Sequence, residues 1–215
     1  THQKQDRQTR RPALGATASH SLRERRAVTQ EQMKSSRWKR WLLYVAAAFV
    51  LLALLIAWLN VRGEAPVEVG PQTAVAATPA QIERGAYLAR AGNCMGCHST
   101  AGSPEFAGGR GVDTPFGTVF APNITPDPKT GIGNWSSSEF WRAMHHGRSK
   151  DGHLLYPAFP YPSYTNVTRE DSDALYAYLR SVKAMEQANK AHALPFPYNT
   201  QAALAAWRAM FFRAG

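Results

Sequence analysis

Residues 94–98, Cys94-Met95-Gly96-Cys97-His98, determine how the rest of this chain is interpreted. A Cys-x-x-Cys-His run is typical of covalent haem attachment, in which two thiols form thioether bonds to the porphyrin and the adjacent imidazole binds the iron. The spacing suits that geometry, because two intervening residues let both sulfurs lie along one porphyrin edge and place the histidine below the ring. We therefore expect one covalent haem c, bound through Cys94 and Cys97, with His98 as the proximal iron ligand.

Other interpretations of a Cys-x-x-Cys pair are a thioredoxin-like redox site and half of a zinc site. The chain has 2 cysteines in 215 residues, and both belong to this motif. A four-cysteine zinc site therefore cannot be completed, and no strand-rich βαβ pattern precedes the motif as it does in thioredoxins. Both alternatives are weaker than haem attachment.

Charge is distributed unevenly along the chain. The formal net charge is +10, yet residues 1–40 hold 11 Lys and Arg against 3 Asp and Glu, whereas residues 80–215 hold 13 against 10. The basic excess belongs to the N-terminal tail, which argues against nucleic acid as a partner.

An apolar run follows the tail. Residues 41–59, WLLYVAAAFVLLALLIAWL, carry no charged side chain, and a helix of this length spans roughly the 30 Å hydrocarbon core of a bilayer. Tryptophans lie near both ends of the run, and Arg37, Lys39 and Arg40 precede it, as the positive-inside rule requires of a cytoplasmic flank. We expect a single-pass protein of the bacterial inner membrane, with a cytoplasmic N-terminus and a periplasmic haem domain.

A cleaved signal peptide is the alternative interpretation of this region. The apolar run exceeds the usual length of a signal-peptide core, and the basic tail before it is long. We therefore expect an uncleaved anchor. The sequence then divides into a basic cytoplasmic tail (1–40), a transmembrane helix (41–59), a linker (60–78), the haem domain (79–190) and a C-terminal aromatic helical extension (191–215).

The haem domain is expected to be all-α. Thr78 with Gln81, and Ser136 with Glu139, form capping boxes that predict two helix starts, the first of which leads to Cys94. Thr168 is expected to cap a third helix.

Two segments lack such clear signals. Residues 99–135 are rich in Gly and Pro and are expected to be irregular, with Phe106, Phe116 and Phe120 buried against the haem and no backbone ladder. The last element, about residues 200–212, is expected to be a helix whose apolar side holds Leu204, Trp207, Phe211 and Phe212.

Several stretches carry a resemblance to a known family. They are RGAYLARAGNCMGCHS (84–99), TPFGTVFAPNITPDPKTGIGNWS (114–136), FWRAMHHG (140–147), LYPAFPYPSY (155–164) and DALYAYLRSV (173–182). Together they resemble the first haem domain of the cytochrome c subunits of membrane-bound bacterial dehydrogenases that act on alcohols, gluconate and related sugars or aldehydes. The resemblance implies a class I cytochrome c fold, electron transfer, and dehydrogenase or oxidase subunits and other cytochromes as partners beside the lipid bilayer. It also implies three haem domains, whereas this sequence has one haem motif.

The distal side of the iron departs from that family. Its axial methionine falls at the position of Phe159, and a phenyl ring cannot bind iron. Met144 and His153 are the candidate replacements, and His145 and His146 lie nearby. Each has a plainer role: Met144 suits core packing, and His153 suits a solvated surface. A five-coordinate iron screened by Phe159 is a further alternative.

Two functions follow from these residues. The first is a one-electron relay in a membrane-bound respiratory complex, with any substrate chemistry left to a partner subunit, because the sequence has no nicotinamide or flavin fingerprint. The second is a haem-based small-ligand sensor or a peroxidase that uses an open distal site. We favour the relay, since the motifs outside position 159 match electron-transfer subunits.

Overall fold

The structure is a computed structural model, and it describes residues 14–64, 67 and 77–215. The chain forms two compact units, residues 1–55 and residues 56–215. The predicted basic tail lies partly outside the described residues, as does most of the predicted linker.

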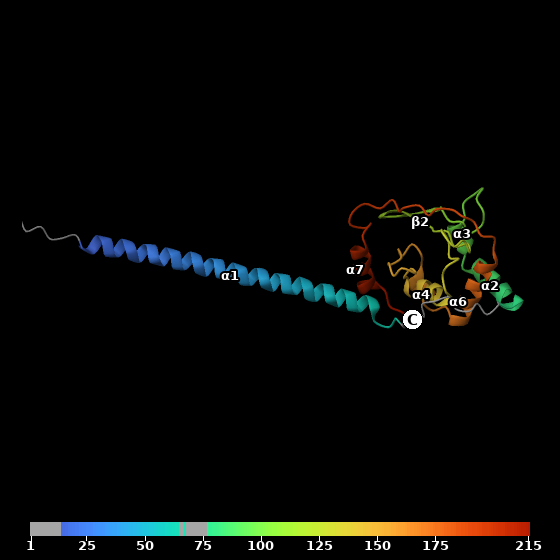
Figure 1. The fold of residues 1–215 in the computed structure, drawn as a ribbon, viewed down its shortest axis with the longest axis horizontal. Helices are drawn as coiled ribbons and strands as arrows, with labels where there is room; N and C mark the ends of the chain where they lie inside the picture. Colours follow the sequence, from blue (N-terminus) through green and yellow to red (C-terminus); the bar gives the residue numbers. More distant parts are fainter. Residues whose placement is uncertain (1–13, 65–66, 68–76) are drawn as a thin grey trace, which may run out of the picture. The chain divides into compact units, whose positions relative to one another are not determined.

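Helix α1, Leu14–Val61, includes the predicted transmembrane run and is one long helix (Figure 1). It begins at Leu14 instead of Trp41, so residues 14–40 are helical too. The part from Arg37 to Val61 is long and apolar enough to cross a membrane. Its large apolar side chains are exposed, among them Tyr44 and Phe49.

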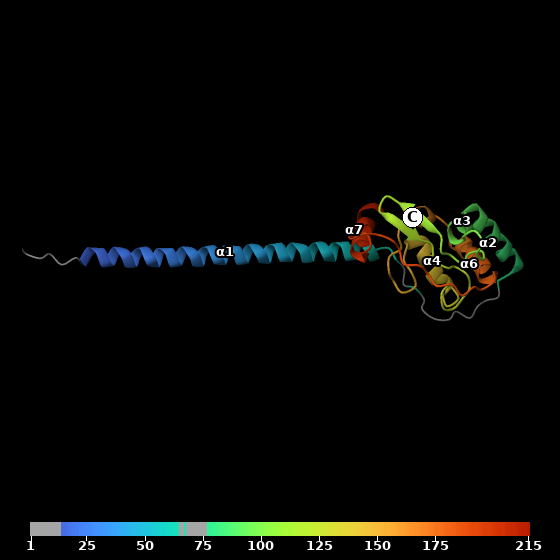
Figure 2. The same cartoon turned by 90° about the horizontal axis from the view of Figure 1, so that it is seen from above.

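The second unit is built around the crossing of α2, Pro79–Ala91, and α6, Arg169–Ser181, which lie side by side in Figures 1 and 2. Gly85 makes the close approach possible, because a Cβ built on it would lie 2.0 Å from the carbonyl oxygen of Ala174. The predicted capping box of α2 is confirmed: the amide of Gln81 donates to Thr78 Oγ1, and the amide of Thr78 donates to the Gln81 side chain.

The remaining predicted helix starts are confirmed as well. Helix α4, Ser137–His146, has the Ser136–Glu139 capping box and ends at Gly147 in the left-handed conformation, with φ of 60°. Thr168 caps α6 by accepting from the amide of Asp171. Two short helices complete this part of the unit, α3, Cys94–His98, and α5, Tyr161–Tyr164.

The expected all-α architecture is corrected by a small antiparallel sheet. Strands β1, Gly111–Thr114, and β2, Gly117–Phe120, form a hairpin, and Thr118 also pairs with Ala193. Phe106 is buried as expected, but Phe116, which lies in the turn between the strands, is 51% exposed. The hairpin holds itself together through backbone pairing, so this segment does not depend on buried aromatic rings as predicted.

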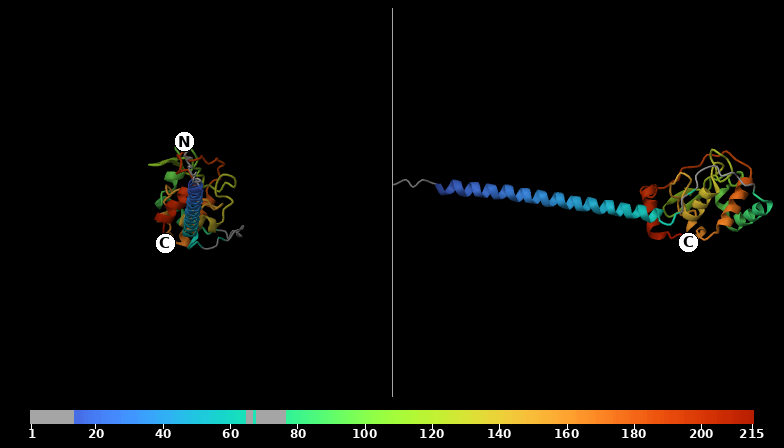
Figure 3. Two further views of the ribbon diagram at one scale, coloured as in Figure 1. Left: turned by 90° about the vertical axis from the view of Figure 1, so that its left-hand side faces the viewer. Right: turned by 60° about the horizontal axis from the view of Figure 1, so that its bottom comes forward.

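The expected orientation of the last helix is also wrong in part. In α7, Gln201–Phe211, Leu204 and Arg208 face the domain, together with Phe212 just beyond the helix. Phe211 instead is 64% exposed. Figures 2 and 3 show α7 at the end of the second unit away from α2.

Candidate functional site

The haem attachment motif forms the short helix α3, placed directly after α2. The amide of Gly92 ends α2 by donating to the carbonyl of Leu88. Asn93 then takes the left-handed conformation, with φ of 51°, and turns the chain into Cys94. Gly96 packs against this turn, because a Cβ built on it would lie 2.4 Å from Asn93 Oδ1. The backbone thus fixes both cysteines on one short helical turn.

The two thiols are free and half-buried. Burial raises the pKa of the Cys94 thiol. A thioredoxin-like nucleophile needs the opposite shift, since the thiolate is the reactive form. Within the described part of the chain, no group of three or more His, Cys, Asp or Glu side chains is placed to hold a metal ion. The environment therefore suits covalent attachment better than redox or zinc chemistry.

His98 is oriented by the loop that precedes α4. Its Nδ1 lies 2.8 Å from the carbonyl oxygen of Pro122, to which a protonated Nδ1 donates. Burial lowers the pKa of His98, although the Pro122 carbonyl acts in the opposite direction. The ring is thereby kept neutral with Nε2 available, the arrangement that an iron ligand requires. The thiols and this imidazole together fit a covalently bound haem.

The main hydrophobic cluster lies beside the attachment helix. Met144, from α4, is buried in it, and Cys94 and Phe159 pack against it. Phe159 also stacks on Tyr164, with ring centroids 5.4 Å apart, and the Tyr164 hydroxyl donates to the carbonyl of Gly92 at 2.8 Å. The structure therefore brings Cys94, Met144 and Phe159 together.

The remaining polar candidates lie elsewhere. His153 is an exposed residue whose Nδ1 lies 2.5 Å from Asp151 Oδ1, and it is no member of the described cluster. His145 stacks on Trp141, and burial lowers its pKa. His146 is buried, and its pKa falls to about 4, chiefly through desolvation. The imidazoles of α4 are therefore neutral at pH 7.

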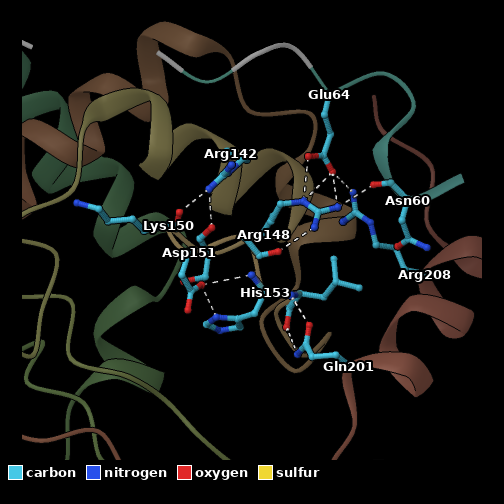
Figure 4. Close-up of polar contacts among 12 residues, drawn as sticks. Asn60, Glu64, Arg142, Arg148, Lys150, Asp151, His153, Gln201 and Arg208 are labelled. Carbon is cyan, nitrogen blue, oxygen red and sulfur yellow. Dashed lines mark hydrogen bonds and ion pairs between the residues drawn. The ribbon is translucent and has the colours of Figure 1, made fainter. Parts of the chain in front are cut away.

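Sequence reasoning missed a buried ionic cluster at the start of the second unit (Figure 4). Glu64 accepts from Arg148 and from Arg208, at 2.9 Å in each case. Asn60 contributes its backbone carbonyl to Arg148 and donates through its side chain to the carbonyl of Ala205. These partners are 84 to 145 residues apart in sequence, so no local pattern could have indicated them. Glu64 and Asn60 fall within the predicted linker.

Comparison with known proteins gives a consistent result. Residues 82–183 match the Cytochrome c family. The gluconate 2-dehydrogenase cytochrome c subunit of Pantoea cypripedii is 50% identical over 136 residues, which are 63% of this chain and 31% of that protein. The fructose dehydrogenase cytochrome subunit of Gluconobacter japonicus is 39% identical over 171 residues, 79% of this chain and 34% of that protein.

A third relative is much larger. This nicotinate dehydrogenase subunit of Pseudomonas putida is 44% identical over 194 residues, 88% of this chain and 16% of that protein. The chain thus spans about a sixth to a third of the length of these relatives.

Proposed function

Residues 82–183 of this chain are a cytochrome c domain of the kind found in dehydrogenase cytochrome subunits, and we propose that it carries one haem c and relays single electrons in a membrane-anchored respiratory complex. The observation that carries this proposal is the CMGCH turn, in which two unbridged thiols precede an imidazole that Pro122 orients. Bound haem supplies the one-electron carrier.

The chain's own residues attach the group, orient its proximal ligand and exclude water. Cys94 and Cys97 would hold the porphyrin through thioethers, and His98 would bind the iron through Nε2. Phe159 and Tyr164 stack beside the attachment helix, and their apolar surface excludes solvent from that side. A covalently held, apolar site keeps reorganisation small when the charge of the iron changes, which is what a relay needs.

Of the two candidates for the sixth ligand, Met144 is favoured. Its side chain is buried, with the residue 7% exposed, and lies in the cluster against which Cys94 packs. His153 is solvent-exposed, and Asp151 occupies its Nδ1. The relatives named above are cytochrome subunits, which supports a relay over a sensor or a peroxidase.

We propose that residues 37–61 anchor the domain in the bacterial inner membrane. The long apolar part of α1, with its exposed side chains, supports a lipid-spanning helix. The basic residues before it favour an N-terminus in the cytoplasm and a haem domain in the periplasm. The partner on the donor side would then be a dehydrogenase subunit, as the names of the relatives suggest.

Substrate-driven reduction in native membranes tests the relay. Membranes that contain the full chain are given alcohol, gluconate, fructose or nicotinate in turn, and the absorbance of reduced haem c is followed. We expect one substrate to reduce the haem and oxygen to reoxidise it, and a matched Cys94→Ala/Cys97→Ala strain to lack this signal. A haem that only dithionite reduces, and that then binds carbon monoxide at once, would contradict the relay.

A further inference from the structure

The outward face of α7 has the reverse of the usual polarity. In a helix at a protein surface, charged side chains face the solvent and apolar ones face the core. In α7 the charged residue, Arg208, is 4% exposed, whereas Met210 and Phe211 are 61% and 64% exposed. The other positions that face outward or lie at the flanks are also apolar: Ala202, Ala203, Ala206, Trp207 and Ala209. This face does not suit water.

The ionic cluster fixes this orientation. Arg208 Nη2 donates to Glu64 at 2.9 Å, and the guanidinium lies 4.3 Å from the centroid of the Phe212 ring (Figure 4). Turning Met210 and Phe211 inward would bring Arg208 out and leave Glu64 without this partner. Because both charges are largely buried, that loss would be costly. The exposure of the apolar face is therefore built into the fold.

Two bonds also fix where α7 lies along the chain. Asn60 Nδ2 donates to the carbonyl oxygen of Ala205, in the middle of α7, at 2.9 Å. Asn60 is the first polar residue after the apolar run of residues 41–59. Glu64, three residues beyond the end of α1, holds Arg208. The middle of α7 is thus bound to the point where the chain leaves its apolar run.

We propose that the outward face of α7, formed by Ala202, Ala206, Met210 and Phe211, lies in the boundary between the headgroups and acyl chains of the bilayer. This inference rests on the proposed membrane anchor, because a spanning α1 puts Asn60 at the membrane surface. An apolar helix face held at that level enters the boundary at little entropic cost, since the anchor already confines it there.

The surrounding residues suit this occupant. Trp58 and Trp207 are aromatic residues of the type enriched at the membrane interface, and the guanidinium of Arg62 lies 5.4 Å from the Trp58 ring centroid. Arg62 and Arg213 are exposed cations near this surface in the chain, and they complement anionic lipid headgroups. A lipid surface explains both the apolar face and the flanking positive charge.

Nitroxide labelling tests the proposal in the full chain. With haem attached, an introduced cysteine is the free thiol. Met210→Cys is compared with Phe49→Cys, inside the proposed span, and Tyr87→Cys, an exposed aromatic position on α2. Each protein is placed in vesicles of phosphatidylethanolamine and phosphatidylglycerol, and collisions with oxygen and with a water-soluble nickel complex are measured by electron paramagnetic resonance.

We expect the label at position 210 to collide more with oxygen than with nickel, as at position 49, while position 87 shows the opposite. Nickel access at 210 equal to that at 87 would overturn the proposal. Low access to both agents would indicate a protein partner, such as a second copy of the chain, and would also overturn it. A label at 49 that reports water would instead show that the membrane anchor itself is wrong.

Discussion

Met144 and Phe159 share one hydrophobic cluster with Cys94, but only the methionine has an atom that can bind iron. If Met144 is the sixth ligand, then Met144→Leu keeps the volume of the core and removes the sulfur. We expect this variant to bind carbon monoxide at least tenfold faster in the ferrous state and to have a lower reduction potential, because thioether ligation raises it.

His153→Gln is the matched control for that experiment. The side chain is exposed and pairs with Asp151, so we expect the same carbon monoxide kinetics and potential as in the unchanged chain. Rapid carbon monoxide binding caused by His153→Gln, and not by Met144→Leu, would assign the ligand to the histidine.

Glu64 neutralises two buried guanidinium groups, those of Arg148 and Arg208. Glu64→Gln keeps the shape of the side chain but leaves both positive charges without their carboxylate. We expect a loss of about 3 kcal/mol in the free energy of unfolding of the domain, measured by denaturant titration of the full chain in detergent.

Glu186→Gln is the control for this change, since it removes the carboxylate from an exposed pair with Lys129. We expect no measurable loss there, because exposed ion pairs contribute little. Equal losses in the two variants would contradict the importance of the buried cluster.

At this scale the sequence indicates only what is local. The CMGCH spacing predicts the attachment residues, because their geometry is set within one turn. The hydrogen bond between His98 and Pro122 spans 24 residues, and that between Glu64 and Arg208 spans 144. Such partners come together only when the loops and helices between them have folded, and their residue types are common on any surface.

The crossing of α2 and α6 depends on a single glycine. A methyl group on Gly85 would lie 2.0 Å from the Ala174 carbonyl oxygen and 2.7 Å from Tyr178 Cβ. We expect Gly85→Ala to separate the helices and to cost about 3 kcal/mol of the free energy of unfolding, despite the higher helix propensity of alanine.

Glu83→Ala, on the exposed part of the same helix, gives the reference for propensity alone. Its free energy of unfolding should stay within about 0.5 kcal/mol of that of the unchanged chain. If Gly85→Ala behaved like Glu83→Ala or stabilised the domain, the tight crossing would be refuted.

Helix starts could be predicted, whereas the hairpin and the rotation of α7 could not. Capping boxes such as Ser136 with Glu139 are complete within four residues. The strands β1 and β2 are four residues each, and their glycines hide the alternation that reveals longer strands. In α7 the apolar pattern extends around the helix, so periodicity cannot choose the buried face; the bond between Arg208 and Glu64 does.

Across the whole molecule, the sequence divides into an apolar helix and a helix-rich cytochrome c domain. Composition indicates the first, since a long uncharged run has few other uses. The motif and its flanking stretches indicate the second. The ties between Asn60 or Glu64 and the C-terminal helix need the folded chain, because they join its two ends.

The mass of the intact, denatured chain after expression with the periplasmic haem-attachment machinery tests covalent attachment at Cys94 and Cys97 most directly. We predict the mass of the polypeptide plus one haem, and the polypeptide mass alone for Cys94→Ala/Cys97→Ala. A chain that reaches the membrane without added haem mass, or a double variant that still carries haem covalently, would contradict the assignment.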